Sequence, residues 1–138
     1  VPIAVEPLAY LQAVSVLERL QRYPSARQAY LAAANHWPDN ALAWAGAGNS
    51  AFALGAFAAA DAAYRRALVL DPDNVLLLNN LAVALGEQGC RAEALAVVDC
   101  ALGQQPGNPV LETTAEEIRQ STARQSDCRY FSCPGTTP

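Results

Sequence analysis

Residues 41–74 read ALAWAGAGNSAFALGAFAAADAAYRRALVLDPDN, and this stretch decides the fold. The 34 residues before it and the 34 after it align with it without a gap, giving three segments, 7–40, 41–74 and 75–108. A fixed period of this length indicates tandem copies of one supersecondary unit. The positions shared by all three copies are Ala26, Ala60 and Ala94; Ala33, Ala67 and Ala101; Pro38, Pro72 and Pro106; and Asn40, Asn74 and Asn108.

The recurring residues predict two antiparallel helices joined by a tight turn in each copy. Ala at the helix crossing allows close approach, because a larger side chain would push the helices apart. Gly55 and Gly89 supply the positive φ that ends the first helix of a copy. The Pro in the linker between copies cannot continue the second helix. The Asn that closes each copy suits the N-cap of the helix that follows it. The first copy departs from this pattern, with Gln21 where the turn Gly is expected, while Pro24 suits the first turn of its helix.

The middle copy resembles the tetratricopeptide repeat family most closely. The resemblance covers residues 7–108 and implies an all-α fold, a right-handed α-solenoid of helix-turn-helix repeats. The residues at the family's signature positions are Trp44, Gly48, Gly55, Ala60, Tyr64, Ala67 and Pro72.

Three segments flank or follow the repeats. Residues 1–6 read as a linker or a mature N-terminus, and residues 109–121 as a capping helix that covers the third repeat. Residues 122–138 form a tail rich in Ser, Thr, Gly and Pro that nevertheless contains cysteines and aromatic residues. The apolar stripe predicted for the capping helix consists of Val110, Leu111, Ala115 and Ile118.

Composition and motifs argue against several classes of function. The formal net charge is −4 and the nine basic residues are scattered, which disfavours nucleic-acid binding. No apolar run approaches the roughly 20 residues that span a bilayer. The single histidine, His36, has no partner for a metal pair or a nucleophile, and no phosphate-binding glycine loop occurs. We therefore expect no enzyme activity, no cofactor and no metal.

The resemblance implies that the first helices of the repeats line a concave, mostly apolar groove. Asn side chains there can hydrogen-bond the backbone of a peptide while apolar neighbours hold its side chains. Alternatively, these Asn bond within their repeat and the apolar residues pack against the next one. A carboxylate clamp is disfavoured, since Leu76 and Asn79 stand where the family places cations. The predicted peptide-binding residues are Leu8, Leu11, Ser15, Leu42, Asn49, Phe52, Leu76, Asn79, Asn80 and Val83.

Four cysteines, all in the last third of the chain, are candidates for disulfides: Cys90, Cys100, Cys128 and Cys133. Cys90 and Cys100 are about 15 Å apart along one predicted helix, too far for a mutual bridge. Two bridges to the tail, or one local Cys128–Cys133 bridge, remain open, as do free thiols. The spacing of the four cysteines lacks the Cys-x-x-Cys motif typical of structural zinc sites.

The leading hypothesis is a protein-protein interaction module that binds a peptide or helix of a partner, including another part of its own parent chain. The alternative is a non-catalytic appendage of a larger bacterial envelope enzyme, similar to cysteine-peptidase proteins. A third possibility is that the tail locks onto the third repeat. Disulfides would indicate a periplasmic or envelope location, and free thiols a cytoplasmic one. The sequence leaves the oligomeric state and the identity of the partner open.

Overall fold

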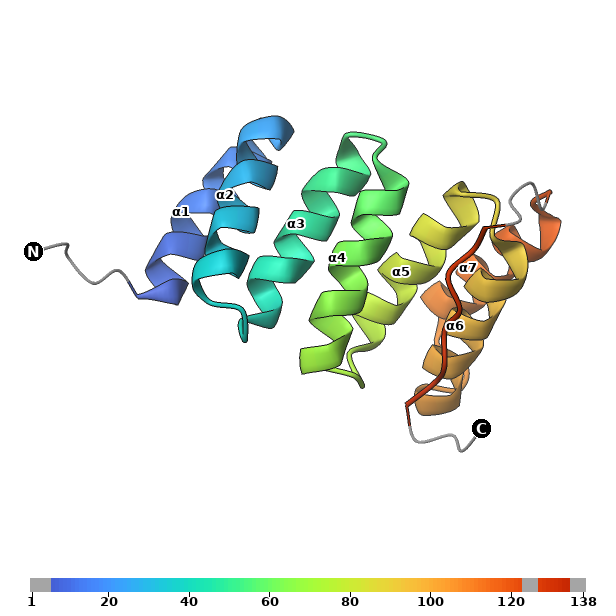
Figure 1. Ribbon diagram of the computed structural model, residues 1–138. Coiled ribbons are helices and arrows are strands. Elements are labelled where there is room, and N and C mark those ends of the chain that lie inside the picture. The colour runs from blue at the N-terminus through green and yellow to red at the C-terminus, as the bar shows by residue number, and fades with distance from the viewer. Residues whose placement is uncertain (1–5, 123–126, 135–138) are drawn as a thin grey trace, which may run out of the picture. The chain divides into compact units, whose positions relative to one another are not determined.

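The computed structural model describes residues 6–122 and 127–134, which contain seven α-helices and no β-strand (Figure 1). The chain divides into two compact units, an N-terminal unit Val1–Leu70 and a C-terminal unit Asp71–Pro138. Of the predicted linker 1–6, only Glu6 is described, and parts of the tail, 123–126 and 135–138, also lie outside the described residues.

The N-terminal unit consists of two helical hairpins. They are formed by α1 (Pro7–Arg19) with α2 (Tyr23–His36), and by α3 (Ala41–Ala53) with α4 (Phe57–Leu70). The predicted crossing alanines of α2 and α4 are at most 1% exposed, so the helices do approach closely there. The core residues of α1–α3 include Leu11, Val14, Ala26, Tyr30, Ala33 and Ala47.

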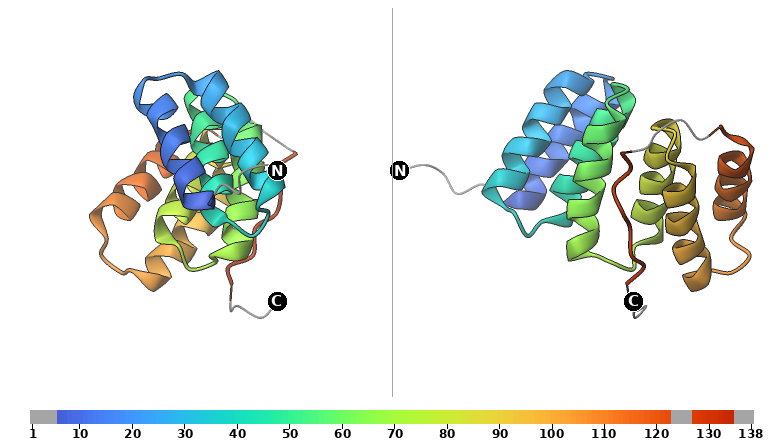
Figure 2. Two further views of the ribbon diagram at one scale, coloured as in Figure 1. Left: turned by 90° about the vertical axis from the view of Figure 1, so that its left-hand side faces the viewer. Right: turned by 45° about the vertical axis from the view of Figure 1, so that its right-hand side comes forward.

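The C-terminal unit contains α5 (Val75–Glu87), α6 (Arg91–Gln104) and α7 (Pro109–Gln120). Figure 2 shows α5 and α6 as a hairpin with α7 beside it. No described helix is long and apolar enough to cross a membrane. The largest fully buried side chains of this unit include Leu78, Leu81, Leu85, Val97, Val98 and Leu111.

The predicted start and stop signals are confirmed. Asn40 and Asn74 each accept a hydrogen bond from a backbone N–H in the first turn of the following helix, with N···O distances of 3.2 and 3.1 Å. Asn108 caps α7 in the same way. Gly55 and Gly89 have φ values of 75° and 78°, and Gln21, which replaces Gly in the first copy, has a φ of 58°.

The apolar face of α7 differs by one residue from the predicted stripe. Leu111, Ala115 and Ile118 are buried as expected, but Val110 is 62% exposed and Thr114 is buried instead. A helical face recurs every three to four residues, so Thr114 shares the face of Leu111 and Ile118, whereas Val110 is turned away from it. This difference places an apolar side chain on the surface.

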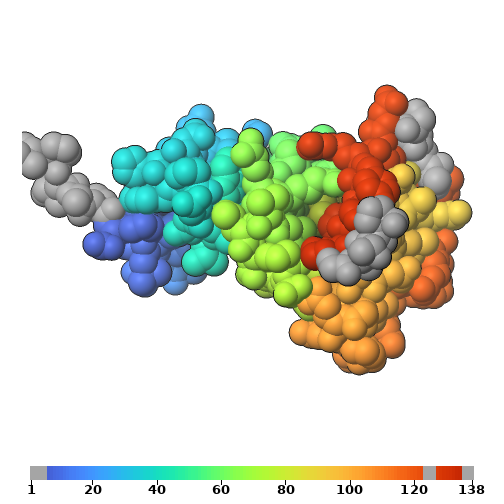
Figure 3. Space-filling model, turned by 60° about the horizontal axis from the view of Figure 1, so that its bottom comes forward, coloured from blue at the N-terminus to red at the C-terminus, as the bar shows by residue number. Residues whose placement is uncertain are grey.

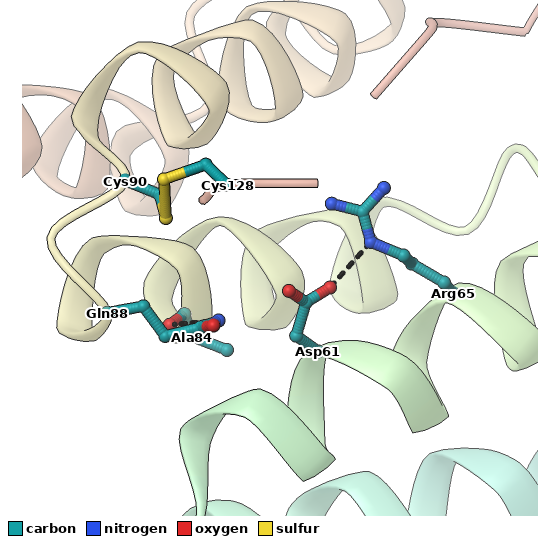
Figure 4. Close-up of polar contacts among 6 residues, drawn as sticks. All are labelled: Asp61, Arg65, Ala84, Gln88, Cys90 and Cys128. Atoms are coloured by element: carbon teal, nitrogen blue, oxygen red, sulfur yellow. Dashed lines mark hydrogen bonds and ion pairs between the residues drawn. A yellow bond between two sulfur atoms is a disulfide. The ribbon is translucent and has the colours of Figure 1, made fainter. Parts of the chain in front are cut away.

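Residues 127–134 of the tail run beside α6 and are joined to it twice (Figures 1 and 2). Disulfides link Cys90 to Cys128 and Cys100 to Cys133, with Cα–Cα distances of 5.7 and 5.6 Å. This is one of the two oxidised arrangements left open by the sequence. Figure 3 shows the described tail residues on the surface next to α6, and Figure 4 shows the Cys90–Cys128 bridge.

Candidate functional site

Each first helix, α1, α3, α5 and α7, carries an exposed aliphatic residue at its second position. The N-terminal unit presents Leu8 and Leu42, which are 61% and 63% exposed, and the C-terminal unit presents Leu76 and Val110, at 69% and 62%. Exposed single apolar residues are common, but here the exposure recurs at one repeat position. In each unit, the pair of exposed side chains therefore marks the surface of that unit's first helices as a candidate contact surface.

In the C-terminal unit, two of these aliphatic residues line one hollow. The hollow lies at the N-terminal ends of α5 and α7 and has a volume of about 320 Å³. Its size is at the lower end of the range for small-ligand sites. The Asn79 side chain is among the residues that line it, and its oxygen Oδ1 is buried and has no hydrogen-bond partner among the described residues. The lining residues are Val75, Leu76, Asn79, Gln105, Asn108, Val110 and Leu111.

A second hollow, of about 110 Å³, lies at the other end of the same two helices. It contains the carboxylates of Glu87 and Glu117, which have no cationic partner in the described part of the chain. Because both hollows lie between α5 and α7, we refer to the surface that joins them as the α5/α7 groove. The residues lining this second hollow are Val83, Gly86, Glu87, Thr114, Glu117, Ile118 and Ser121.

The predicted residues of α5 all lie on or beside this groove. Leu76 and Asn79 line the first hollow and Val83 lines the second. Asn80 is half-buried on the same helix. Their role in binding stays a prediction, but the structure does bring three of them into one groove.

The predicted residues of the N-terminal unit are in more varied settings. Leu11 is buried in the core, so it offers no surface to a ligand in this conformation. Asn49 Oδ1 accepts a hydrogen bond from the Tyr64 hydroxyl at 2.7 Å, an internal contact of the kind named as the alternative. Ser15 donates to the Gln12 carbonyl.

Phe52 is half-buried on α3 and meets the ring of Phe57 edge to face, with ring centroids 5.1 Å apart. This contact joins α3 to α4 within their repeat. Leu8, Leu42 and Asn49 are thus the predicted residues of this unit that are exposed.

Buried tyrosines lie near the carboxylate of Glu18 in the N-terminal unit. Burial raises the pKa of both Tyr30 and Tyr64 above the ordinary value of 10.0; for Tyr30 a hydrogen bond with Glu18 and then the negative charge of Glu18 raise it further, and for Tyr64 the charge alone does. Glu18 Oε1 is buried and has no hydrogen-bond partner among the described residues. The first helix of this unit therefore also carries an acidic group.

Sequence reasoning missed the contribution of α7 to the groove, because α7 was interpreted only as a cover for the third repeat. A signal was available in the repeat register. When the 34-residue numbering is continued past Asn108, Val110, Glu117 and Ser121 occupy positions 2, 9 and 13, the positions of the groove residues Leu76, Val83 and Glu87 in the third copy.

Two other clusters of polar or ligand-bearing side chains lie outside the groove. Cys90, Glu93 and Cys128 bring possible ligand atoms within 4.8 Å of one another, but the two sulfurs are joined in a disulfide and offer no thiolate. Asp61 of α4 is buried and forms an ion pair with Arg65 one turn later, at 2.5 Å (Figure 4). Because both partners belong to the same helix and satisfy each other, we assign this ion pair a structural role in α4.

Comparison with known proteins gives one family and several similar structures. The family model described as "TPR repeat" matches residues 48–89. No curated protein sequence matches the chain.

Three solved domains superpose on most of the chain. The first TPR of Spaghetti (RPAP3), bound to the HSP90 peptide SRMEEVD, has a TM-score of 0.78 and 19% identity, over 86% of this chain and 97% of that one. The Arabidopsis OM64 TPR domain has a TM-score of 0.76 and 19% identity, over 83% and 94%. The Sgt2 TPR domain from Aspergillus fumigatus has a TM-score of 0.76 and 15% identity, over 85% and 79%. At these identities the likeness concerns the fold alone.

Proposed function

Because the chain is a tetratricopeptide repeat protein with the all-α solenoid fold of that family, we propose that it is an interaction module that binds a peptide segment of a partner protein in the α5/α7 groove. The RPAP3 domain is an example of this fold with a linear peptide bound. We take from it only the mode of binding. The groove residues of this chain differ in charge from what the acidic peptide SRMEEVD would require.

The observation that carries the proposal is the unpartnered Oδ1 of Asn79 at a hollow whose other lining residues are four aliphatic ones together with Gln105 and Asn108. An acceptor removed from water without a donor costs about 1–3 kcal/mol. A backbone N–H of a bound peptide would supply that donor once the Asn79 amide turns its oxygen toward the hollow. Leu76 and Val110, both more than 60% exposed at the same hollow, would then cover an apolar side chain of the same peptide.

The disulfide-linked tail is compatible with this use of the groove. The described tail residues are joined to α6, and none of them lines either hollow between α5 and α7. No described feature favours the alternative of an appendage to an envelope enzyme, and we do not extend the proposal to it.

The proposal is tested by selecting peptides from a random library with the oxidised protein and measuring their affinities by fluorescence anisotropy. We expect Leu76→Ser combined with Val110→Ser to weaken binding at least tenfold, since two apolar contacts are lost. Val69→Ser is the matched control, because Val69 is 80% exposed but lies on the second helix α4. Equal losses in both variants, or NMR shifts confined to α6, would exclude the α5/α7 groove.

A further inference from the structure

The charge of the α5/α7 groove points to the chemistry of its partner. Residues 71–138 contain nine Asp and Glu but four Arg, a formal charge of −5, whereas residues 1–70 contain four Asp and Glu and five Arg, a charge of +1. These values add to the −4 of the whole chain. The negative charge is therefore confined to the part of the sequence that contains the groove.

Within the groove, the acidic residues lie at one end. Glu87 of α5 and Glu117 of α7 flank the smaller hollow from opposite sides, and both are exposed. The larger hollow has no charged lining residue. Helix α5 has no basic residue, and the one Arg of α7, Arg119, lies 3.7 Å from Glu116 and lines neither hollow. Arg91 of α6 donates a hydrogen bond to the carbonyl of Ser121, which lines the smaller hollow, at 3.3 Å, but no ion pair joins a described cation to Glu87 or Glu117.

The two hollows also determine the distance between two anchor side chains of a bound peptide. Val110 of the first hollow and Glu117 of the second are seven residues apart on one helix, about 10 Å at a rise of ~1.5 Å per residue. An extended peptide covers this distance in about three residues at ~3.3 Å each. The smaller hollow, at about 110 Å³, is lined by the carboxylates of Glu87 and Glu117, which suit a guanidinium or ammonium head better than an apolar group.

We propose that the partner of the α5/α7 groove is a basic peptide segment, with an aliphatic side chain in the larger hollow and an Arg or Lys three to four residues away between Glu87 and Glu117. This inference rests on the proposed function and specifies its ligand. Asn79 would bond the peptide backbone between the two anchors. Charge-assisted hydrogen bonds from a guanidinium to two carboxylates supply the selectivity.

The test uses two acetylated peptides in a Gly-Ser background, one containing Leu-Gly-Ser-Arg-Arg and the other Leu-Gly-Ser-Glu-Glu. We expect the oxidised full chain to bind the Arg peptide at least about tenfold more tightly than the Glu peptide at low salt. The preference should shrink as the salt concentration rises, because exposed charges are screened. NMR shifts caused by the Arg peptide should map to α5 and α7.

A charge-reversal variant makes the assignment specific. Glu87→Lys with Glu117→Lys should reverse the preference between the two peptides. The control is Asp99→Lys with Glu112→Lys, which changes the net charge equally at exposed positions outside both hollows. If the control reverses the preference as well, the effect belongs to overall charge and the inference is overturned.

Failure of this inference is distinguishable from failure of the proposed function. If peptides selected from the library bind at α5 and α7 while the Arg and Glu peptides bind equally, the groove binds peptides but not basic ones. If no peptide perturbs α5 or α7, the proposed function itself is wrong. Both outcomes are read from the same NMR spectra.

Discussion

Gly48 of α3 lies directly against the ring of Tyr64, and Gly46 lies against the ring of Tyr30. A Cβ at Gly48 would be 2.6 Å from Tyr64 Cδ1, and the ring is buried. In an ordinary helix Gly→Ala stabilises by up to about 1 kcal/mol. Here we expect Gly48→Ala to lower the free energy of unfolding by about 1–3 kcal/mol through overpacking. Gly103→Ala is the control, because a Cβ there meets nothing within 4 Å, and urea titrations should show it unchanged or more stable.

The backbone of Gln21 gives a second prediction at the scale of one residue. Its φ of 58° lies in the left-handed region, which costs a residue with a Cβ about 1–2 kcal/mol relative to Gly. We expect Gln21→Gly to raise the free energy of unfolding by about 1 kcal/mol, and Gly55→Gln, with a φ of 75° and open space around it, to lower it similarly. Denaturant midpoints that move in the same direction for both variants would contradict this account.

The buried tyrosine Tyr30 makes stability depend on pH in the alkaline range. Its folded-state pKa is raised, by burial and then by Glu18, while the unfolded-state pKa stays near 10.0. The unfolded state therefore releases its proton first, so stability is full below about pH 10 and falls as the pH rises further. We expect thermal melts between pH 9 and pH 11 to show this loss, and Tyr30→Phe to make it shallower. An unchanged slope in the variant would show that other groups cause the loss.

At the scale of the element, three helices begin with the same device. The side chains of Asn40, Asn74 and Asn108 each accept a backbone N–H of the following first turn. We expect Asn74→Ala to cost about 1 kcal/mol, and Asn74→Gly only a few tenths, since Gly tolerates the N-cap backbone. Asn35→Ala, at an exposed position inside α2, is the control and should be neutral or slightly stabilising. Thermal unfolding followed by circular dichroism measures all three.

The helices were predictable from sequence because their signals are local. Pro at helix starts, Asn caps and turn glycines act within a few residues, so the start of α3 after Asn40, the start of α5 after Asn74 and the turns at Gly55 and Gly89 were predictable from the repeat register. The groove was less predictable, since it depends on which residues two helices leave exposed. Asn49 could bind a ligand or Tyr64, and only the structure shows the bond to Tyr64. The assignment of Val110 to the covered face of α7 was wrong for the same reason.

At the scale of the whole molecule, the pairing of the cysteines could not be chosen from the sequence. Spacing excluded a bridge between Cys90 and Cys100 but did not place the tail. In the structure, the distance between the two cysteines of α6 matches the length of the tail segment between its own two cysteines. Ten residues of helix rise about 15 Å, and the five steps from Cys128 to Cys133 cover about 16 Å when extended. An extended tail can therefore meet both cysteines of α6 at once. The proposed location in an oxidising compartment, such as the periplasm, would keep these bridges intact.

The two disulfides are also the basis of the last prediction. In the chain-entropy account, a bridge across 38 residues contributes about 4 kcal/mol. Once it is closed, the second bridge joins residues already connected by a path of about 16 residues and contributes about 3 kcal/mol. Removing one pair, as in Cys100→Ala with Cys133→Ala, should therefore cost about 3 kcal/mol, and removing both about 7 kcal/mol.

That loss is comparable to the whole stability of a typical domain, so full reduction should unfold much of the C-terminal unit. Thermal melts with and without a phosphine reductant measure the effect, and NMR signals of α6 and α7 report where it occurs. The variant lacking all four cysteines should be insensitive to the reductant. If reduction leaves the melting temperature and the α6 signals of the natural chain unchanged, the bridges do not hold the tail on α6, and the tail lies there by packing alone or not at all.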